Sequence, residues 1–388
     1  MPASPPLAIT GIGCLAAPGG DVAAIRAALA QGGDGLRLHP GCGIPVAETA
    51  PTARFTGHLP PVPGRTAALA VAAAREALRD AGASDLAEIG VVVGTCTAGM
   101  PESEADFFHL GREVDPPAYR RQQAHRVTQA VARITRCAGP QSTHSVACAS
   151  AAAAVVEAME WLRQGIVEQV VVVGADALCR VTTAGFTSLQ LVDPQGCRPL
   201  LAERGGMSLG EGAGAMVLET VAHARRRGAR VRASLLGWGL RADGYHLTAP
   251  DPAGTQLDGA IGDALADGGI GNGQVGFVCA HGTGTRDNDA CETAALSRRF
   301  GAVPTASWKR NFGHTMGACA LIEAVGCVLA LESQRLWASA GASEGTPLPG
   351  IEVVRSTRAG RLDTVLSTTL AFGGTDAALL FGRAERAR

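Results

Sequence analysis

The sequence predicts an α/β fold in which helices cover both faces of buried β-sheets. Short, continuous apolar runs alternate with alanine-rich stretches of helical length, and such runs are typical of strands that are buried on both faces. Apolar residues make up 46% of the 388 residues and aromatic residues only 4%, so we expect a core of Ala, Val and Leu. The 51 glycines are spread without a collagen-like period and indicate tight turns.

The first half of the chain alternates between predicted strands and helices. The apolar runs predict strands at residues 7–12, 89–93, 143–146, 170–173 and 213–219. The stretches between them predict helices at 21–30, 65–81 and 150–164, the last of which ends at Gly165. The polar segment 100–121 predicts an irregular cap or interface loop.

The second half repeats this order. It contains predicted strands at 232–238 and 275–280 and predicted helices at 256–266, 289–300 and 315–332. A hairpin-like pair of strands, 364–369 and 377–381, closes the chain around a glycine loop. Two similar halves that meet near residue 230 suggest an internal duplication, although no sequence identity between them proves it. The predicted division is therefore 1–230 and 231–388.

Composition excludes several classes of function. A net charge of -1 gives no electrostatic reason to bind nucleic acid or an anionic membrane. We find no apolar run of membrane-spanning length, and the N-terminus lacks the basic and apolar regions of a signal peptide. The eleven cysteines show no CxxC pair and no zinc spacing, so we expect reduced thiols, a cytoplasmic protein and no metal.

Lys309 is the one lysine among 34 basic residues, and it precedes His314 by five positions. A position that keeps lysine where arginine serves everywhere else indicates a need for a compact ammonium on a flexible stem. The alternative is a bias in composition with one survivor.

Cys148 follows a predicted strand and opens a predicted helix, with small residues on both sides. The helix dipole and the unpaired backbone N–H groups at that position are expected to lower the pKa of the thiol and favour the thiolate. Cys148 is thus a candidate nucleophile. The alternative is a buried core cysteine, as we expect for the other ten.

Two histidines stand in similar settings. His281 ends a predicted strand and begins the sequence His-Gly-Thr-Gly-Thr, in which Thr283 and Thr285 offer hydroxyl groups along a loop. His314 follows a glycine and precedes a long predicted helix. A structural histidine and a polar turn are the alternatives.

Two further features complete the candidate site. Glu323 follows His314 by nine residues, and we pair it with Lys309 because a buried ammonium needs an anion. A solvated surface charge is the alternative. The backbone N–H groups of the loop that begins at Phe372 and Gly373 could stabilise an oxyanion, although the loop could also be a simple turn.

In combination these motifs resemble the elongating β-ketoacyl-[acyl carrier protein] synthases of the KAS I/II type. The resemblance covers residues 7–383, and its motifs occur in the order that the family has. It implies an α/β thiolase fold in which two fused halves form a five-layer αβαβα sandwich, usually as a dimer. The matching segments are Val-Ala-Cys148-Ala-Ser, Gly210-Glu-Gly-Ala-Gly, Tyr245-His-Leu-Thr-Ala-Pro, Ala-His281-Gly-Thr-Gly-Thr, Lys309-x-x-x-Gly-His314 and Phe372-Gly-Gly-Thr-Asp.

The resemblance also implies a reaction, the decarboxylative Claisen condensation of an acyl group with malonyl-[acyl carrier protein] to give 3-oxoacyl-[acyl carrier protein]. Cys148 would hold the acyl group. His281 and His314 would donate to the thioester carbonyl of the malonyl group as CO2 leaves. The backbone N–H groups of Cys148 and Phe372 would form the oxyanion hole.

Other roles follow from the same resemblance. Lys309 and Glu323 match the family's supporting pair, and Phe372 matches its gating aromatic residue. The expected substrate-binding residues are Thr283, Thr285, Phe186 and Gly373. No cofactor is expected to bind tightly, because the substrates ride on the phosphopantetheine arm of an acyl carrier protein. The second subunit would be a copy of this chain or a chain-length-factor-like protein.

Several positions depart from the family pattern. Leu370-Ala371 replaces an aromatic-glycine pair before Phe372, and Leu200-Leu201 replaces Phe-Asp after Arg198-Pro199. Thr368 replaces an asparagine near a cation site that some members have, so no metal is predicted. These changes disfavour an ordinary saturated fatty acyl substrate and favour a specialised polyketide or polyene pathway over fatty acid synthesis.

Three other readings remain open. A non-elongating chain-length-factor-like partner lacks the nucleophile, so Cys148 argues against it. A Cys/His acyl hydrolase needs no second histidine or lysine. A thiolase or an initiating synthase pairs its cysteine with different residues than two histidines. The sequence does not name the acyl chain or the partner subunit.

Overall fold

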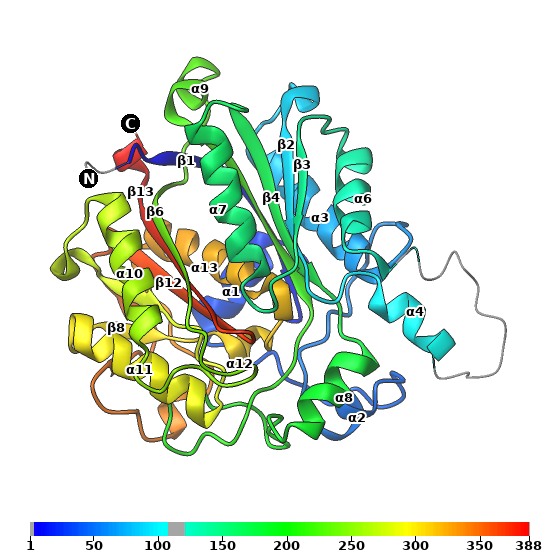
Figure 1. Ribbon diagram of the computed structural model, residues 1–388, viewed down its shortest axis with the longest axis vertical. Coiled ribbons are helices and arrows are strands. Elements are labelled where there is room, and N and C mark those ends of the chain that lie inside the picture. The colour runs from blue at the N-terminus through cyan, green and yellow to red at the C-terminus, as the bar shows by residue number, and fades with distance from the viewer. Residues whose placement is uncertain (1–3, 108–119, 121, 388) are drawn as a thin grey trace.

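The computed structural model describes residues 4–107, 120 and 122–387, and eleven of its strands form one continuous sheet. The strand order is β10-β8-β7-β12-β13-β6-β1-β5-β4-β2-β3 (Figure 1). The strands of the first half are β1 (Leu7–Ala16), β2 (Gly90–Gly94), β3 (Gln141–His144), β4 (Gln169–Asp176) and β5 (Gly212–Thr220). Those of the second half are β6 (Ala233–Ala242), β7 (Phe277–Cys279), β8 (Pro304–Ala306), β10 (Glu352–Val353), β12 (Thr364–Ala371) and β13 (Thr375–Arg383). A separate pair joins β9 (Arg335–Leu336) and β11 (Arg358–Ala359).

The two halves share one topology. Counted within its own half, and leaving aside the two-residue β10, each set of strands lies in the order third, second, fourth, fifth, first. In both halves the second strand runs parallel to its two neighbours, and the fifth runs antiparallel to its two neighbours. The duplication suggested by the sequence is therefore present in the strand order, although the sequences of the halves have diverged.

Strands β1 and β6 join the halves edge to edge. They pair antiparallel over three residues, Leu7 with Leu235, Ala8 with Ser234 and Ile9 with Ala233. The predicted division into 1–230 and 231–388 stays a prediction, and it falls in the connection that leads into β6.

Helices pack on both faces of each half-sheet and give five layers (Figure 1). The outer helices of the first half are α3 (Arg65–Asp80) and α6 (His125–Thr135), and those of the second half are α10 (Thr255–Gly268) and α11 (Arg286–Phe300). Between the half-sheets lie α7 (Ser150–Arg163) and α13 (Cys319–Ser333). The remaining α-helices of the described residues are α1 (Val22–Gln31), α2 (Pro45–Thr49), α4 (Met100–Phe107), α8 (Arg180–Ser188), α9 (Val221–Arg226) and α12 (Lys309–Phe312).

The hydrophobic core follows these layers. Along β4, Val170 and Val172 face the central helices, whereas Val171 and Val173 face the outer helices. Because both faces of the strand are covered, every residue of β4 is buried and the run is continuously apolar up to its end. A third cluster fills the space between β12, β13 and the helices α10 and α11. The predicted five-layer αβαβα architecture is thus confirmed.

Helix α13 lies in the middle of the molecule, and Glu323 is the one charged residue among its buried residues. Among the described residues, Met316–Ser333 is the one helical segment long and apolar enough to cross a membrane, and 89% of it is buried inside the protein. From the sequence we expected no apolar run of membrane-spanning length, and this segment contradicts that expectation. The segment is apolar because it is a core helix, buried between the two half-sheets.

The bounds of several predicted elements differ from the structure. The strand predicted at 143–146 ends at His144, because a tight turn follows it. The helix predicted from residue 315 begins at Cys319, after a 3-10 turn over Met316–Ala318. In the segment predicted to be irregular, Met100–Phe107 is a helix, and 108–119 and 121 lie outside the described residues.

Two glycines let α3 pack directly on β1. A Cβ atom at Gly13 would lie 2.1 Å from the carbonyl oxygen of Ala73, and one at Gly11 would lie 2.1 Å from that of Ala77. Both contacts are with the backbone of the helix, which has no flexible side chain to move away. Helix α3 can therefore approach β1 this closely only because Gly11 and Gly13 have no side chain.

We predict that Gly13→Ala destabilises the protein by about 1–3 kcal/mol, the usual cost of overpacking. Unfolding in urea, followed by circular dichroism, measures the effect. Gly273→Ala is the matched control, because a Cβ atom there meets nothing within 4 Å. Equal midpoints for the two variants would contradict the packing argument.

Candidate active site

Cys148 lies in a tight turn between β3 and the first residue of α7. The hydroxyl of Ser150 accepts a hydrogen bond from the N–H of Val146 (2.8 Å) and donates to the carbonyl of Ala147 (2.6 Å). Ala147 has φ of 46°, a left-handed value that is uncommon for a residue with a side chain. Backbone strain of this kind concentrates at functional sites, and here it precedes the reactive thiol.

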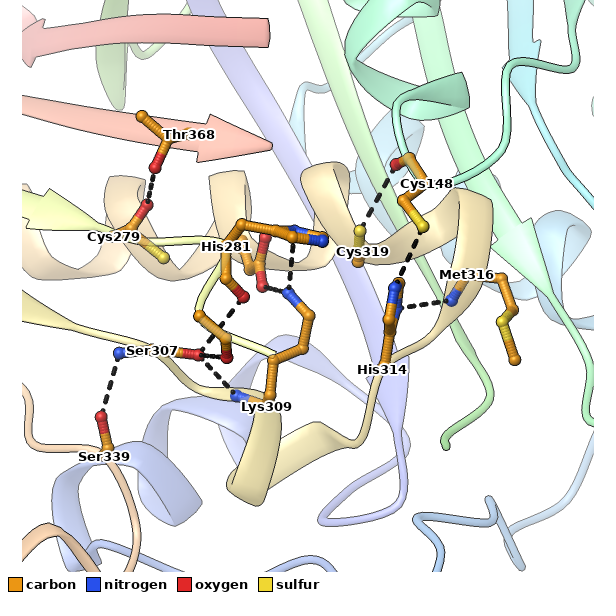
Figure 2. Close-up of polar contacts among 12 residues, drawn as sticks. Cys148, Cys279, His281, Ser307, Lys309, His314, Met316, Cys319, Ser339 and Thr368 are labelled. Atoms are coloured by element: carbon orange, nitrogen blue, oxygen red, sulfur yellow. Dashed lines mark hydrogen bonds and ion pairs between the residues drawn. The ribbon is translucent and has the colours of Figure 1, made fainter. Parts of the chain in front are cut away.

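His314 faces the sulfur of Cys148, with 3.1 Å between Sγ and Nε2 (Figure 2). The backbone N–H of Met316 donates to Nδ1 of the same ring (3.2 Å), so Nδ1 carries a lone pair. Burial, and then the charge of Lys309, lower the pKa of His314 well below its usual value. The ring is therefore neutral at pH 7 with its hydrogen on Nε2, directed toward Cys148.

The loop that carries His314 is held by the segment before β5. The N–H of His314 donates to the carbonyl of Ser208 (2.7 Å), and the N–H of Gly210 donates to the carbonyl of His314 (2.9 Å). A Cβ atom at Gly210 would lie 2.4 Å from the carbonyl oxygen of Phe312. The glycine of the Gly210-Glu-Gly sequence thus allows the close approach of two loops.

His281 lies beside His314 in an edge-to-face arrangement, with 5.2 Å between the ring centroids. The ammonium of Lys309 lies 3.5 Å from Nδ1 of His281. The pKa of His281 is well below its usual value because of burial first, then because of the charge of Lys309, and then because a protonated His314 would repel a second positive charge. His281 is therefore also neutral at pH 7, with its hydrogen on Nε2.

Lys309 and Glu323 form an ion pair behind the histidines (Figure 2 shows the lysine). Both side chains are buried, with 1% and 2% of their residues exposed, which excludes a solvated surface charge. Burial alone would lower the pKa of Lys309. The charge of Glu323, its hydrogen bond and the nearby thiols of Cys319 and Cys279 together outweigh burial, so the net direction of the pKa is upward. The pair that was predicted from charge balance is present.

The pKa of the Cys148 thiol differs from the value that the sequence led us to expect. Burial raises its pKa to about 11, although the charge of Lys309 and the backbone N–H groups of Phe372 and Cys148 act in the opposite direction. The predicted lowering of the pKa at the helix N-terminus is wrong in its net direction. A short-range helix dipole cannot offset complete removal of the thiolate from water, so the resting form at neutral pH is the thiol.

A cavity of about 430 Å³ opens beside these residues and is lined by both halves of the chain. Seven of the predicted site residues line it, namely Cys148, Phe186, His281, Thr283, Thr285, His314 and Phe372. The rings of Phe186 and Phe372 lie 5.5 Å apart between centroids, and the hydroxyls of Thr283 and Thr285 lie 2.9 Å apart. Gly373 is exposed, has φ of 83°, and donates its N–H to the carbonyl of Leu247 (2.9 Å).

Two buried carboxylates that were not predicted hold the site loops. Glu292 accepts hydrogen bonds from the N–H groups of His281 and Gly282, both at 2.7 Å, and from the hydroxyl of Thr368 (2.6 Å). Asp176, at the end of β4, accepts from the N–H of Gly317 (2.7 Å) in the turn that follows His314. A charged residue that ends an apolar strand was the one signal available for Asp176.

Most of the chain is similar to known proteins. The model of the β-ketoacyl synthase N-terminal domain matches residues 4–224, and that of the C-terminal domain matches residues 232–342. Nodulation protein E of Rhizobium meliloti (strain 1021) is 32% identical over 331 residues, which are 82% of each chain. The tetracenomycin polyketide synthase ketoacyl synthase alpha subunit of Streptomyces glaucescens is 34% identical over 350 residues, 84% of this chain and 82% of that protein. The solved ishigamide ketosynthase/chain length factor has a TM-score of 0.91 at 31% identity and covers 98% of this chain and 100% of its own.

The raised pKa of Cys148 predicts how alkylation depends on pH. Since only the thiolate reacts, the rate of modification by iodoacetamide should rise about tenfold per pH unit up to about pH 10. Peptide mass spectrometry follows the label, and Cys148→Ala identifies the labelled peptide. A plateau reached below about pH 8 would mean that the helix N-terminus outweighs burial after all.

Proposed function

This chain belongs to the β-ketoacyl synthase family, and we propose that Cys148, His281 and His314 carry out its decarboxylative Claisen condensation. One observation carries the assignment. The thiol lies 3.1 Å from an imidazole Nε2 whose ring is neutral and whose other nitrogen already accepts a hydrogen bond. Such a ring can donate toward developing negative charge, but it has no free position for the thiol proton.

The first step is transfer of an acyl group to Cys148. The sulfur attacks the carbonyl of an acyl thioester on a carrier protein, the bond to the carrier's sulfur breaks, and the thiol proton of Cys148 ends on the departing thiol. The Nε2–H of His314 and the N–H groups of Cys148 and Phe372 face the sulfur and stabilise the charge that develops on it. The two backbone N–H groups remain when the imidazole is removed, so acylation of the buried thiol does not depend on His314 alone.

The second step is decarboxylation of the malonyl thioester. The bond to the carboxylate breaks, CO2 leaves, and the electron pair forms an enolate whose oxygen carries the charge. Two imidazole Nε2–H groups, from His281 and His314, offer hydrogen bonds to this oxygen. Neutral rings suit this role because each keeps its hydrogen while the charge grows.

The third step joins the two carbon chains. The enolate carbon attacks the acyl carbonyl on Cys148, and the backbone N–H groups of Cys148 and Phe372 stabilise the tetrahedral oxyanion. When this intermediate collapses, the carbon–sulfur bond to Cys148 breaks and 3-oxoacyl-carrier protein leaves. The thiolate takes up a proton and the resting thiol returns.

The remaining predicted residues support this chemistry. Lys309, with Glu323 as its counter-ion, is proposed as a positioning residue that orients His281. Thr283 and Thr285 line the cavity and are proposed to contact the phosphopantetheine arm, Phe186 is proposed to contact the substrate, and Phe372 is proposed as the gate. The left-handed backbone of Gly373 would let the gate loop move. We propose no tightly bound cofactor.

Partners and pathway are proposed from the relatives. We propose an acyl carrier protein as substrate carrier, and either a copy of this chain or a chain-length-factor-like protein as second subunit. The similarity to a polyketide ketosynthase alpha subunit supports a specialised polyketide pathway, and we also propose a polyene pathway as an alternative setting and a cytoplasmic location. The tautomer of His314 disfavours a Cys/His hydrolase, whose imidazole must accept the thiol proton.

We predict that substitutions of Cys148, His281 and His314 impair different steps of the reaction. Cys148→Ala should abolish acylation and condensation. His281→Ala and His314→Ala should still acylate Cys148 but release CO2 roughly two to three decades more slowly, because each lost donor faces the enolate oxygen. Mass spectrometry of acyl- and malonyl-carrier protein incubations measures both steps. Acylation at another cysteine, or decarboxylation at the wild-type rate in a histidine variant, would remove that residue from the mechanism.

Lys309→Arg tests whether the site needs a compact ammonium. Arginine keeps the charge but is larger, planar and forked, so it should impair condensation nearly as much as Lys309→Ala. The comparison is made at equal folded fraction, because breaking a buried ion pair costs on the order of 3–5 kcal/mol. Normal condensation by the arginine variant would show that charge alone is sufficient.

A further inference from the structure

The ammonium of Lys309 contacts two of three side chains that could together bind a metal ion, His281 and Glu323. A nitrogen of His281, the sulfur of Cys319 and a carboxylate oxygen of Glu323 all lie within 4.8 Å of one another, and all three residues are buried. Figure 2 shows the side chain of Lys309 directed toward His281. Ligand atoms around a tetrahedral zinc ion are about 3.5 Å apart, so a small contraction would complete such a site.

The possible ligand atoms in this cluster have the lone pairs that binding of a metal ion requires. Nδ1 of His281 presents a lone pair to Lys309, and its hydrogen is on the other nitrogen. The second carboxylate oxygen of Glu323 is buried without a hydrogen-bond partner. Cys319 is a free thiol that donates to the carbonyl of Cys148 (3.4 Å). Nitrogen, carboxylate oxygen and thiolate sulfur are the ligand types that zinc prefers.

We propose that the Lys309 ammonium occupies a latent zinc site formed by His281, Cys319 and Glu323, and thereby excludes divalent metal from the pocket behind Cys148. A tethered monovalent cation neutralises Glu323 and takes the lone pair of His281. If the ammonium is removed, Zn²⁺ binds the same three groups, and the thiol of Cys319 releases its proton to water as the sulfur–zinc bond forms. No oxidation or reduction is involved, and water takes the fourth position.

The second group of possible ligands is protected in a different way. Cys148, His281 and His314 also have ligand atoms within 4.8 Å of one another. A metal bound to Nε2 of either ring would force the ring hydrogen onto Nδ1, where the N–H of Met316 and the ammonium of Lys309 already donate. Metal-binding histidines have the opposite arrangement, an acceptor next to the second nitrogen. The latent site therefore lies behind His281, not at the nucleophile.

Lys309→Met removes the charge but keeps an unbranched side chain, so it is the informative variant. Metal-free protein is titrated with Zn²⁺ by equilibrium dialysis and with Co²⁺ by absorption, in which thiolate ligation gives a charge-transfer band. Lys309→Met should bind one Zn²⁺ per chain about a hundredfold more tightly than the wild type, and Zn²⁺ should raise its melting temperature. Arg310→Met is the control, because Arg310 pairs with Asp34 outside the cluster.

Second substitutions identify the ligands. In the Lys309→Met background, Cys319→Ala should remove the cobalt–thiolate band and weaken zinc binding at least about tenfold, whereas Cys148→Ala should leave both unchanged. If Lys309→Met does not fold, Lys309→Gln replaces it, because its amide still donates to Glu323. Equal zinc affinity in the wild type and the variants, no uptake by the variants, or loss of the band with Cys148→Ala would overturn the proposal. None of these readouts requires condensation activity.

Discussion

A buried positive charge beneath two histidines is the interaction on which the site depends. The ammonium of Lys309 lies next to Nδ1 of His281, and protonation of either imidazole would bring a second positive charge into the same poorly solvated volume. Burial first, and then this charge, keep both rings neutral. Glu323 makes the arrangement possible, because an ammonium with no counter-ion could not be buried at this depth. The ion pair thus serves the protonation state of its neighbours more than the stability of the fold.

Much of the fold was predictable because its strands are covered on both faces. A strand such as β4 must then be apolar along its interior, and Val170 to Ala175 appear in the sequence as an unbroken run. The joint between β1 and β6 was not predictable, because three backbone pairs require no particular side chains. Helix α6 was passed over although Val127 and Val131 lie at helical spacing, so no physical obstacle explains that omission.

The site was predictable to the extent that its chemistry is local. Cys148, His281 and His314 each stand in a short motif of small residues, and charge balance leads from Lys309 to Glu323. The pKa of Cys148 was not predictable, because the helix N-terminus is visible in the sequence, whereas burial comes from distant loops and helices. Glu292 and Asp176 accept hydrogen bonds from backbone N–H groups. Every residue except proline has such a group, so these contacts require no particular sequence at the residues that donate.

Because the two halves share one strand order, Cys148 and His314 occupy equivalent positions in them. Cys148 lies in the connection from the third strand of its half to a central helix, and His314 lies in the equivalent connection of the other half. A molecule built from two identical halves could offer only the same residue twice at these two points. A thiol opposite an imidazole requires that the copies be free to differ. Fusion of the halves into one chain supplies that freedom, since each copy of the connection can then mutate alone.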